Sequence, residues 1–310
     1  MSNRSSTGSI VGLIALIVLG AIVIYAVQTL PKGAQATPTP ASGGAANLRD
    51  AVMRNDAAAV RAALASGADP NLPLPGDDSG RGALTPLMTA ASEGKPEAIR
   101  ILLDAKAKVD ARTEDGRSAL MFAAMREDTA CLRAILDAGA RTDARNSDGW
   151  TALMFASARG DVIGVRALVQ AGADVNASNK WRQTALMVAS LNGSIEKVRA
   201  LLEAGANAAA ADADGNTSLL IAAGAGDEVT PELLTVLVKA GAPVDATDTD
   251  GVTALMKAAE RGDADRVRAL LASGANRTLK DKPNGWTARD WAAKRDDEKG
   301  RAVVALLDAR

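Results

Sequence analysis

Residues 146–178 read NSDGWTALMFASARGDVIGVRALVQAGADVNAS, and variants of this stretch recur along most of the chain. Each copy contains a related tetrapeptide, and these are TPLM, SALM, TALM, TALM, TSLL and TALM, which begin at Thr85, Ser118, Thr151, Thr184, Thr217 and Thr253. Successive tetrapeptides begin 33, 33, 33, 33 and 36 residues apart. A unit of this size cannot bury its own apolar face and stacks on its neighbours. The period therefore predicts a solenoid.

Turn and capping residues divide each repeat into two helices. Asp148-Gly149 is a turn dipeptide, and Thr151 can cap the helix that follows it. Gly160 ends that helix, and the next one can be capped by Asp161, whose equivalents are Asp128, Ser194, Asp227 and Asp263. A left-handed cap is expected at Gly172, whose equivalents are Gly139, Gly205, Gly241 and Gly274. Each repeat is thus expected to form two short antiparallel helices and a projecting turn.

Eight repeats account for the chain from residue 47 onward, and the predicted fold class is an all-α solenoid. Their bounds are 47–73, 80–112, 113–145, 146–178, 179–211, 212–247, 248–280 and 281–310. The first lacks the turn and opening-helix pattern, and the sixth carries three extra residues near Glu228–Pro231. The last has Arg289 and Asp290 where apolar residues usually lie, as expected of a terminal cap.

This pattern resembles the ankyrin repeat. The family pattern D-x-x-G-x-T-P-L-H-x-A-A, followed by a helix ending L-L-x-x-G-A, is matched around Thr151, Leu153, Ala156 and Gly172. One departure is systematic, because the family's histidine is replaced by Met88, Met121, Met154, Met187 and Met256. Apolar packing is expected to take the place of the imidazole hydrogen bond. The resemblance implies a protein-binding scaffold and no enzymatic activity.

Composition excludes several kinds of site. The chain has no histidine, so no Ser-His-Asp or Cys-His arrangement and no histidine metal site can form. The single Cys131 cannot form an intramolecular disulfide and is expected to be a buried, inert thiol. With 36 basic and 37 acidic residues, the chain has no electrostatic drive toward nucleic acid. We expect no cofactor and no small-molecule substrate.

The N-terminal segment is apolar enough to cross a membrane. Ile10–Val27 is almost continuously apolar, and eighteen helical residues measure ~27 Å, close to the thickness of the hydrocarbon core. The interpretation is a short tail at 1–8, a transmembrane signal anchor at 9–30, a linker at 31–46 rich in proline, glycine and alanine, and repeats over 47–310. The alternative is a signal peptide cleaved after Ala36, which would release a secreted protein.

Charge bias favours one orientation of this anchor. Arg4 and the terminal amine precede the span, and Lys32 follows it. The positive-inside rule then mildly favours a cytoplasmic N-terminus. We expect a single-pass protein of the bacterial inner membrane whose repeats lie in the periplasm.

Most of the chemically suggestive residues have a structural explanation. The equivalent positions Phe122, Phe155 and Trp291 are expected in the core. The acidic turns at Asp212–Gly215 and Asp245–Gly251 lack the distal glutamate of a calcium loop and match ordinary ankyrin turns, so no metal site is expected. Gly224-Ala225-Gly226 follows no strand, which argues against nucleotide binding.

A surface remains as the candidate site. In ankyrin proteins the turn tips and the exposed ends of the first helices line a concave groove. The positions that map there are Arg117, Met125, Arg126, Trp150, Arg159, Trp181, Arg182, Leu191, Asn192, Glu260 and Arg261. Tryptophan and arginine are enriched in interface hot spots, and three of the four tryptophans (Trp150, Trp181 and Trp286) fall in turns. The first nine positions are the predicted protein-binding residues.

The sequence thus predicts a membrane-anchored ankyrin scaffold that binds another protein. An accessory or inhibitory subunit of a partner enzyme is the alternative, and an enzyme of unknown type is disfavoured because acid and base groups do not cluster.

Overall fold

A computed structural model describes residues 43–73 and 83–309. The predicted anchor at 9–30, the cleavage motif at Ala34–Ala36 and most of the linker lie outside this range. Within it, no helix combines the length and the apolar character that crossing a bilayer requires. The described chain divides into two compact bodies at Glu114/Asp115, and each is considered separately below.

The N-terminal body contains two helix pairs. They are α2 (Gly43–Arg54) with α3 (Ala57–Ala65), and α4 (Pro86–Glu93) with α5 (Pro96–Asp104). Repeat one therefore has an opening helix after all, and this helix begins inside the segment expected to be linker. The pattern was missed because Ala-Asn-Leu-Arg carries neither the threonine cap nor the preceding turn.

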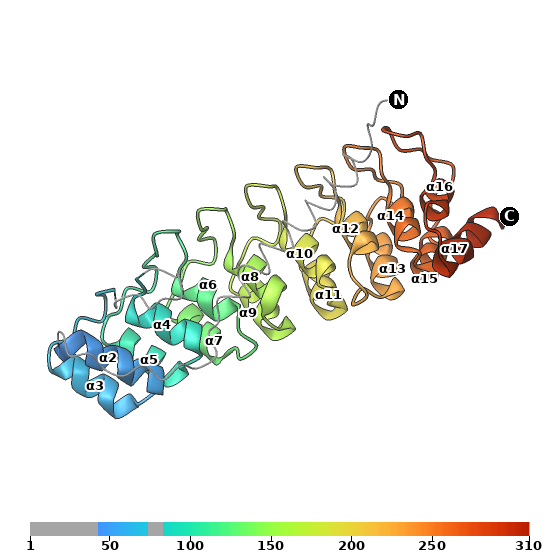
Figure 1. Cartoon of the computed structure of the whole chain (residues 1–310). Helices are drawn as coiled ribbons and strands as arrows, with labels where there is room; N and C mark the ends of the chain where they lie inside the picture. The colour runs from blue at the N-terminus through green and yellow to red at the C-terminus, as the bar shows by residue number, and fades with distance from the viewer. Residues whose placement is uncertain (1–42, 74–82, 310) are drawn as a thin grey trace, which may run out of the picture. The chain divides into compact units, whose positions relative to one another are not determined.

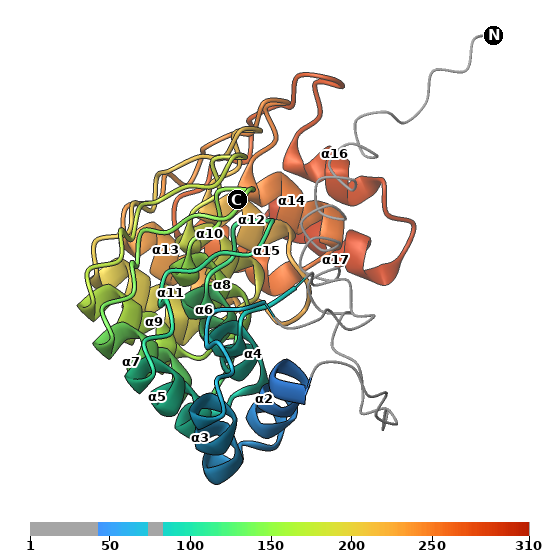
Figure 2. The same ribbon diagram turned by 90° about the vertical axis from the view of Figure 1, so that its left-hand side faces the viewer.

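The C-terminal body stacks six further pairs, whose bounds are α6 (Ala119–Ala124), α7 (Ala130–Asp137), α8 (Ala152–Arg159), α9 (Val162–Gln170), α10 (Ala185–Leu191), α11 (Ile195–Glu203), α12 (Ser218–Gly224), α13 (Pro231–Lys239), α14 (Ala254–Arg261), α15 (Ala264–Ala272), α16 (Ala288–Ala293) and α17 (Glu298–Asp308). Each first helix contacts the next first helix, and each second helix the next second helix. The turn before the first helix of each repeat is here called its finger and takes the number of that repeat. These fingers all project to the same side of the body (Figures 1 and 2). Helices are the only regular elements of the described residues, which confirms the all-α prediction.

The capping residues act largely as predicted. The hydroxyl of Thr151 accepts a hydrogen bond from the Met154 amide at 3.4 Å, and the carboxylate of Asp161 accepts one from the Gly164 amide at 2.7 Å. Ser194 makes no such side-chain bond. Asp128 lies one residue before the cap position of α7, which is Thr129, although its carboxylate accepts the Ala130 amide at 2.9 Å. Asp227 is not a cap either, because the extra residues of repeat six move the start of α13 to Pro231, with Thr230 before it.

The left-handed positions were also predicted correctly. Gly139, Gly172 and their equivalents have φ between 82° and 93°. Lys106 occupies the same position in repeat two with φ 64°, so it adopts a conformation that disfavours any residue with a Cβ.

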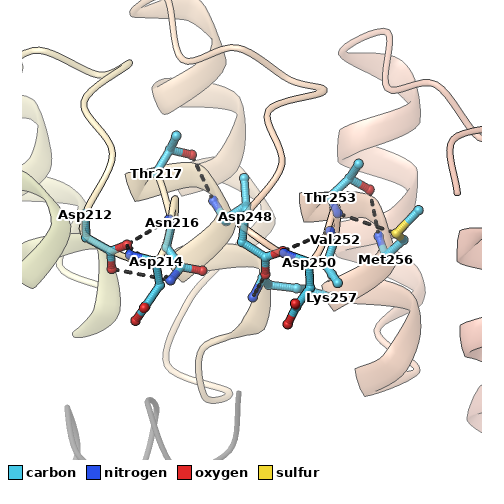
Figure 3. Close-up of polar contacts among 11 residues, drawn as sticks. Asp212, Asp214, Asn216, Thr217, Asp248, Asp250, Val252, Thr253, Met256 and Lys257 are labelled. Carbon is cyan, nitrogen blue, oxygen red and sulfur yellow. Dashed lines mark hydrogen bonds and ion pairs between the residues drawn. The ribbon is translucent and has the colours of Figure 1, made fainter. Parts of the chain in front are cut away.

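The methionines that replace the family's histidine are buried in the core. In repeat seven the thioether does more than pack, because Met256 Sδ lies 3.5 Å from the Thr253 amide and accepts its hydrogen bond (Figure 3). The prediction that apolar packing alone replaces the imidazole is therefore wrong for this repeat.

Backbone hydrogen bonds join the fingers of the C-terminal body into a ladder. The amide of each finger's second residue donates to a carbonyl of the preceding finger, at 3.0 Å from Lys180 to Asp148 and 2.9 Å from Ala213 to Trp181. Inside each of the fourth to seventh fingers an Asn or Asp side chain accepts the amides two and four residues on, as Asp212 does from Asp214 at 3.0 Å and from Asn216 at 2.8 Å (Figure 3). The fingers are held by backbone contacts.

A buried arginine secures the long connection in repeat six. Arg266 of α15 is fully buried, and its guanidinium donates to the carbonyls of Ala222, Ala223, Ala225, Gly226 and Val229. Its Nε lies 3.0 Å from the carboxylate of Asp263, which partly balances the charge. This side chain therefore ties the connection between α12 and α13 to the neighbouring repeat.

Candidate protein-binding surface

The nine predicted residues lie on the fingers and first helices of repeats three to five, all within the C-terminal body. We call them the finger–helix surface: Arg117, Met125, Arg126, Trp150, Arg159, Trp181, Arg182, Leu191 and Asn192. Seven of the nine side chains are half-buried, Arg182 is exposed and Trp150 is buried. They come from three consecutive repeats whose first helices, α6, α8 and α10, pack against one another.

The carboxyl ends of these helices meet closely. The Asn192 carboxamide donates to the Ala158 carbonyl at 3.1 Å, which joins α10 to α8. A Cβ on Gly160 would lie 2.5 Å from the Ala124 carbonyl oxygen, so only glycine permits the approach of α8 to α6. Met125, Arg159 and Leu191 are thereby displayed from one closely packed row.

Arg159 is half-buried in this row. Burial lowers the pKa of its guanidinium from the ordinary value, because removal of water disfavours the charged form. The residue remains a cation at physiological pH.

Lys197 lies close to this row and was missed by the sequence analysis. Its ammonium donates to the Ser157 carbonyl at 3.3 Å, from the third residue of α11 to the last turn of α8. Burial lowers its pKa, and the carboxylates of Asp161 and Glu127 oppose that shift. A cation near a helix C-terminus is favoured by the helix dipole. The sequence feature that could have identified Lys197 is its charge, because the equivalent residues of the two preceding repeats are the uncharged Cys131 and Gly164.

Two of the predicted binding residues, Trp150 and Arg117, have their side chains engaged in contacts within the fold. Trp150 is 5% exposed and packs on Phe155 with ring centroids 5.2 Å apart, so the expectation of an exposed indole is wrong. Arg117 pairs with Asp115 at 2.6 Å and lies over the ring of Phe122, 5.1 Å from its centroid.

The three positions expected in the core differ from one another. Phe122 and Trp291 are buried, as predicted, whereas Phe155 is half-buried. Cys131 is a buried thiol, as predicted. Phe155 therefore contributes apolar area next to the finger–helix surface.

The fifth finger presents the most accessible part of the surface. Trp181 is half-buried and Arg182 is exposed, and the Lys180 ammonium lies 4.6 Å from the centroid of the Trp181 ring. Lys180 also pairs with Asp148 of the fourth finger. An indole and two cations thus lie together at one finger tip.

The acidic fingers of repeats six and seven use their carboxylates internally (Figure 3). Asp248 accepts the Val252 amide at 2.9 Å and pairs with Lys257 at 3.1 Å, where both side chains are largely buried. Burial raises the pKa of Asp212, although the amides of Asn216 and Asp214 favour its charged form. Within the described residues no three acidic or thiol groups are placed to hold a metal ion together.

Comparisons with known proteins agree with this architecture. The family model for ankyrin repeats (3 copies) matches residues 48–146, 87–179, 121–212, 164–235 and 219–309. The crystal structure of the human ASB11 ankyrin repeat domain is similar, with a TM-score of 0.66 and 24% identity, over 73% of this chain and 99% of that one. No curated protein matches by sequence. Because the family matches extend over nearly all of the described residues, the chain belongs to the ankyrin-repeat family.

Proposed function

We propose that this chain is a membrane-tethered scaffold that binds another protein through its finger–helix surface. The observation that carries the proposal is the row of half-buried apolar and cationic side chains displayed by three consecutive repeats. Hydrogen-bonded fingers and closely packed helices hold the row in place, so little ordering is needed on binding. Membership of the ankyrin family supports an interaction role in place of catalysis.

The tether and the compartment complete the proposal. Residues 9–30 anchor the chain in the inner membrane of a bacterium, and the repeats lie in the periplasm. The support is the apolar run Ile10–Val27 and the position of Arg4 before it. Alkaline phosphatase fused after residue 310 should be active. Fluorescence from a C-terminal fusion to a fluorescent protein that folds only in the cytosol would show that the orientation is the opposite.

Site-specific photo-crosslinking tests the binding surface. A photoreactive amino acid replaces Trp181 on the fifth finger, and a matched probe replaces Ile163, which is 48% exposed on α9 of the adjacent repeat. Irradiated membranes should yield a crosslinked protein from position 181 and none from position 163. A product from position 163 alone would place binding on the second helices. Assay of the captured protein with and without this chain then separates a scaffold from an inhibitory subunit.

A further inference from the structure

The fifth finger departs from its neighbours where the chain turns. The fourth and sixth fingers place Asp148-Gly149 and Asp214-Gly215 at the tip, and both glycines have φ above 80°. The fifth finger has Trp181-Arg182 in the same positions, and Arg182 has φ 63°. A left-handed arginine is strained where glycine would not be. The turn itself therefore does not account for this residue.

The base of the fifth finger is complete without these two side chains. Asn179 accepts the Trp181 amide at 3.0 Å and the Gln183 amide at 2.9 Å, and its carboxamide donates to that of Gln183 at 2.9 Å. Asn179 and Gln183 are both buried. Backbone hydrogen bonds and the Lys180–Asp148 ion pair join this finger to the fourth and sixth fingers, and none of these contacts uses the side chain of Trp181 or Arg182. Folding thus leaves the side chains at the tip available for another role.

The groups at this tip have a definite chemistry. Within the described residues, no carboxylate lies at ion-pair distance from the exposed guanidinium of Arg182. Lys180 covers part of the Trp181 ring and is itself paired with Asp148. A guanidinium and an indole carried by consecutive residues of one finger tip favour a carboxylate together with an aromatic or apolar side chain. Such paired groups are common at the centres of protein interfaces.

The flanking fingers narrow the choice of partner. Asp148 lies at the tip of the fourth finger, and Asp214 and Asp250 lie at the tips of the sixth and seventh, so among these four neighbouring tips only the fifth carries cationic residues. A nucleic-acid strand running along the fingers would meet these carboxylates with its phosphates, which is unfavourable. A short protein segment can place one or two carboxylates at the fifth finger alone.

We propose that Trp181 and Arg182 form a recognition site for an acidic protein segment that carries an aromatic side chain. This inference rests on the proposed function, because it names the chemistry of the partner that the finger–helix surface binds. The strain at Arg182 is the stability cost of carrying an arginine, in place of glycine, next to Trp181 at the finger tip.

The test uses the full chain in detergent and a fluorescent random copolymer of glutamate and tyrosine as the probe. Binding should weaken at least tenfold in Trp181→Ala and in Arg182→Glu. The control is Arg133→Glu on α7, which alters charge equally at another exposed arginine and should change affinity less than twofold. Arg182→Gly should also weaken binding tenfold while raising the melting midpoint, which separates recognition from folding.

Several outcomes would overturn the inference. Equal losses in Arg133→Glu and Arg182→Glu would indicate a general charge effect. Binding of oligo-deoxythymidine as tightly as the copolymer would assign the tip to nucleic acid. Failure of the unaltered chain to bind the copolymer would refute this partner chemistry, whereas crosslinking from position 181 would still support the proposed function.

Discussion

Arg182 stands where the neighbouring fingers have glycine, and Arg266 stands where α13 has Leu233. Both arginines thus depart from the repeat, but one is exposed and the other is buried. Arg266 is fully buried and donates to five carbonyls, so its charge is satisfied by the fold. Arg182 is exposed, adopts a left-handed conformation and has no ion pair within the described residues. The comparison indicates that one departure from the repeat stabilises the structure, whereas the other is retained at a cost to stability.

Removal of the buried arginine should produce the largest effect. Arg266→Met leaves five carbonyls and Asp263 without their cation, so we expect a loss of about 3 kcal/mol in unfolding free energy. Urea unfolding followed by circular dichroism measures the change. Arg268→Met, at an exposed position of the same helix, is the control and should change stability by less than about 0.5 kcal/mol. Similar midpoints for the two variants would show that the carbonyl cage contributes little.

The second prediction is that the tryptophans of the fourth and fifth fingers contribute differently to stability. Trp150→Ala removes a buried ring that packs on Phe155, and we expect a cost of about 3 kcal/mol. Trp181→Ala removes a half-buried ring at a finger tip, and its cost should stay below about 1 kcal/mol. Thermal melting of both variants measures the contrast. Equal destabilisation would mean that Trp181 also belongs to the core and would weaken the case for recognition.

Relief of left-handed strain should stabilise the chain at two separate places. Lys106→Gly and Arg182→Gly each replace a positive-φ residue, and each should gain about 0.5–1 kcal/mol after the added entropy of the unfolded chain is counted. The reverse change, Gly139→Lys, should destabilise the chain through φ alone, because a Cβ there would meet no atom within 4 Å. A lower melting midpoint for Lys106→Gly would contradict the strain argument. Only Arg182→Gly should also lose copolymer binding.

The smallest effect concerns pH. Burial raises the folded-state pKa of Asp212 above its unfolded value, so the folded state binds more protons between the two values and stability falls as pH rises through that window. Asp212→Asn keeps the turn, as Asn146 and Asn179 do in the equivalent places. We expect a gain of about 0.5 kcal/mol or less at neutral pH that disappears in acid. Urea unfolding at both pH values measures it, and a gain that grows in acid would reverse the assigned sign.

The sequence predicted features that repeat and missed those that depend on a single local arrangement. The period, the threonine caps and the left-handed glycines could all be recognised because several copies show the same position. The burial of Trp150 could not, since it depends on a contact with Phe155 in the following helix. Arg266 was missed because the three extra residues of repeat six create its carbonyl cage, and no other repeat has this connection.

Amide hydrogen exchange of the full chain, with and without the glutamate–tyrosine copolymer, shows whether the fifth finger binds the acidic segment. Recognition by the fifth finger predicts added protection in peptides that cover residues 179–184, with smaller changes at the ends of α8 and α10. Peptides that cover α9 and α11 should exchange at the same rate in both states. Protection confined to these second helices, or none at residues 179–184 when the copolymer is bound, would contradict the account.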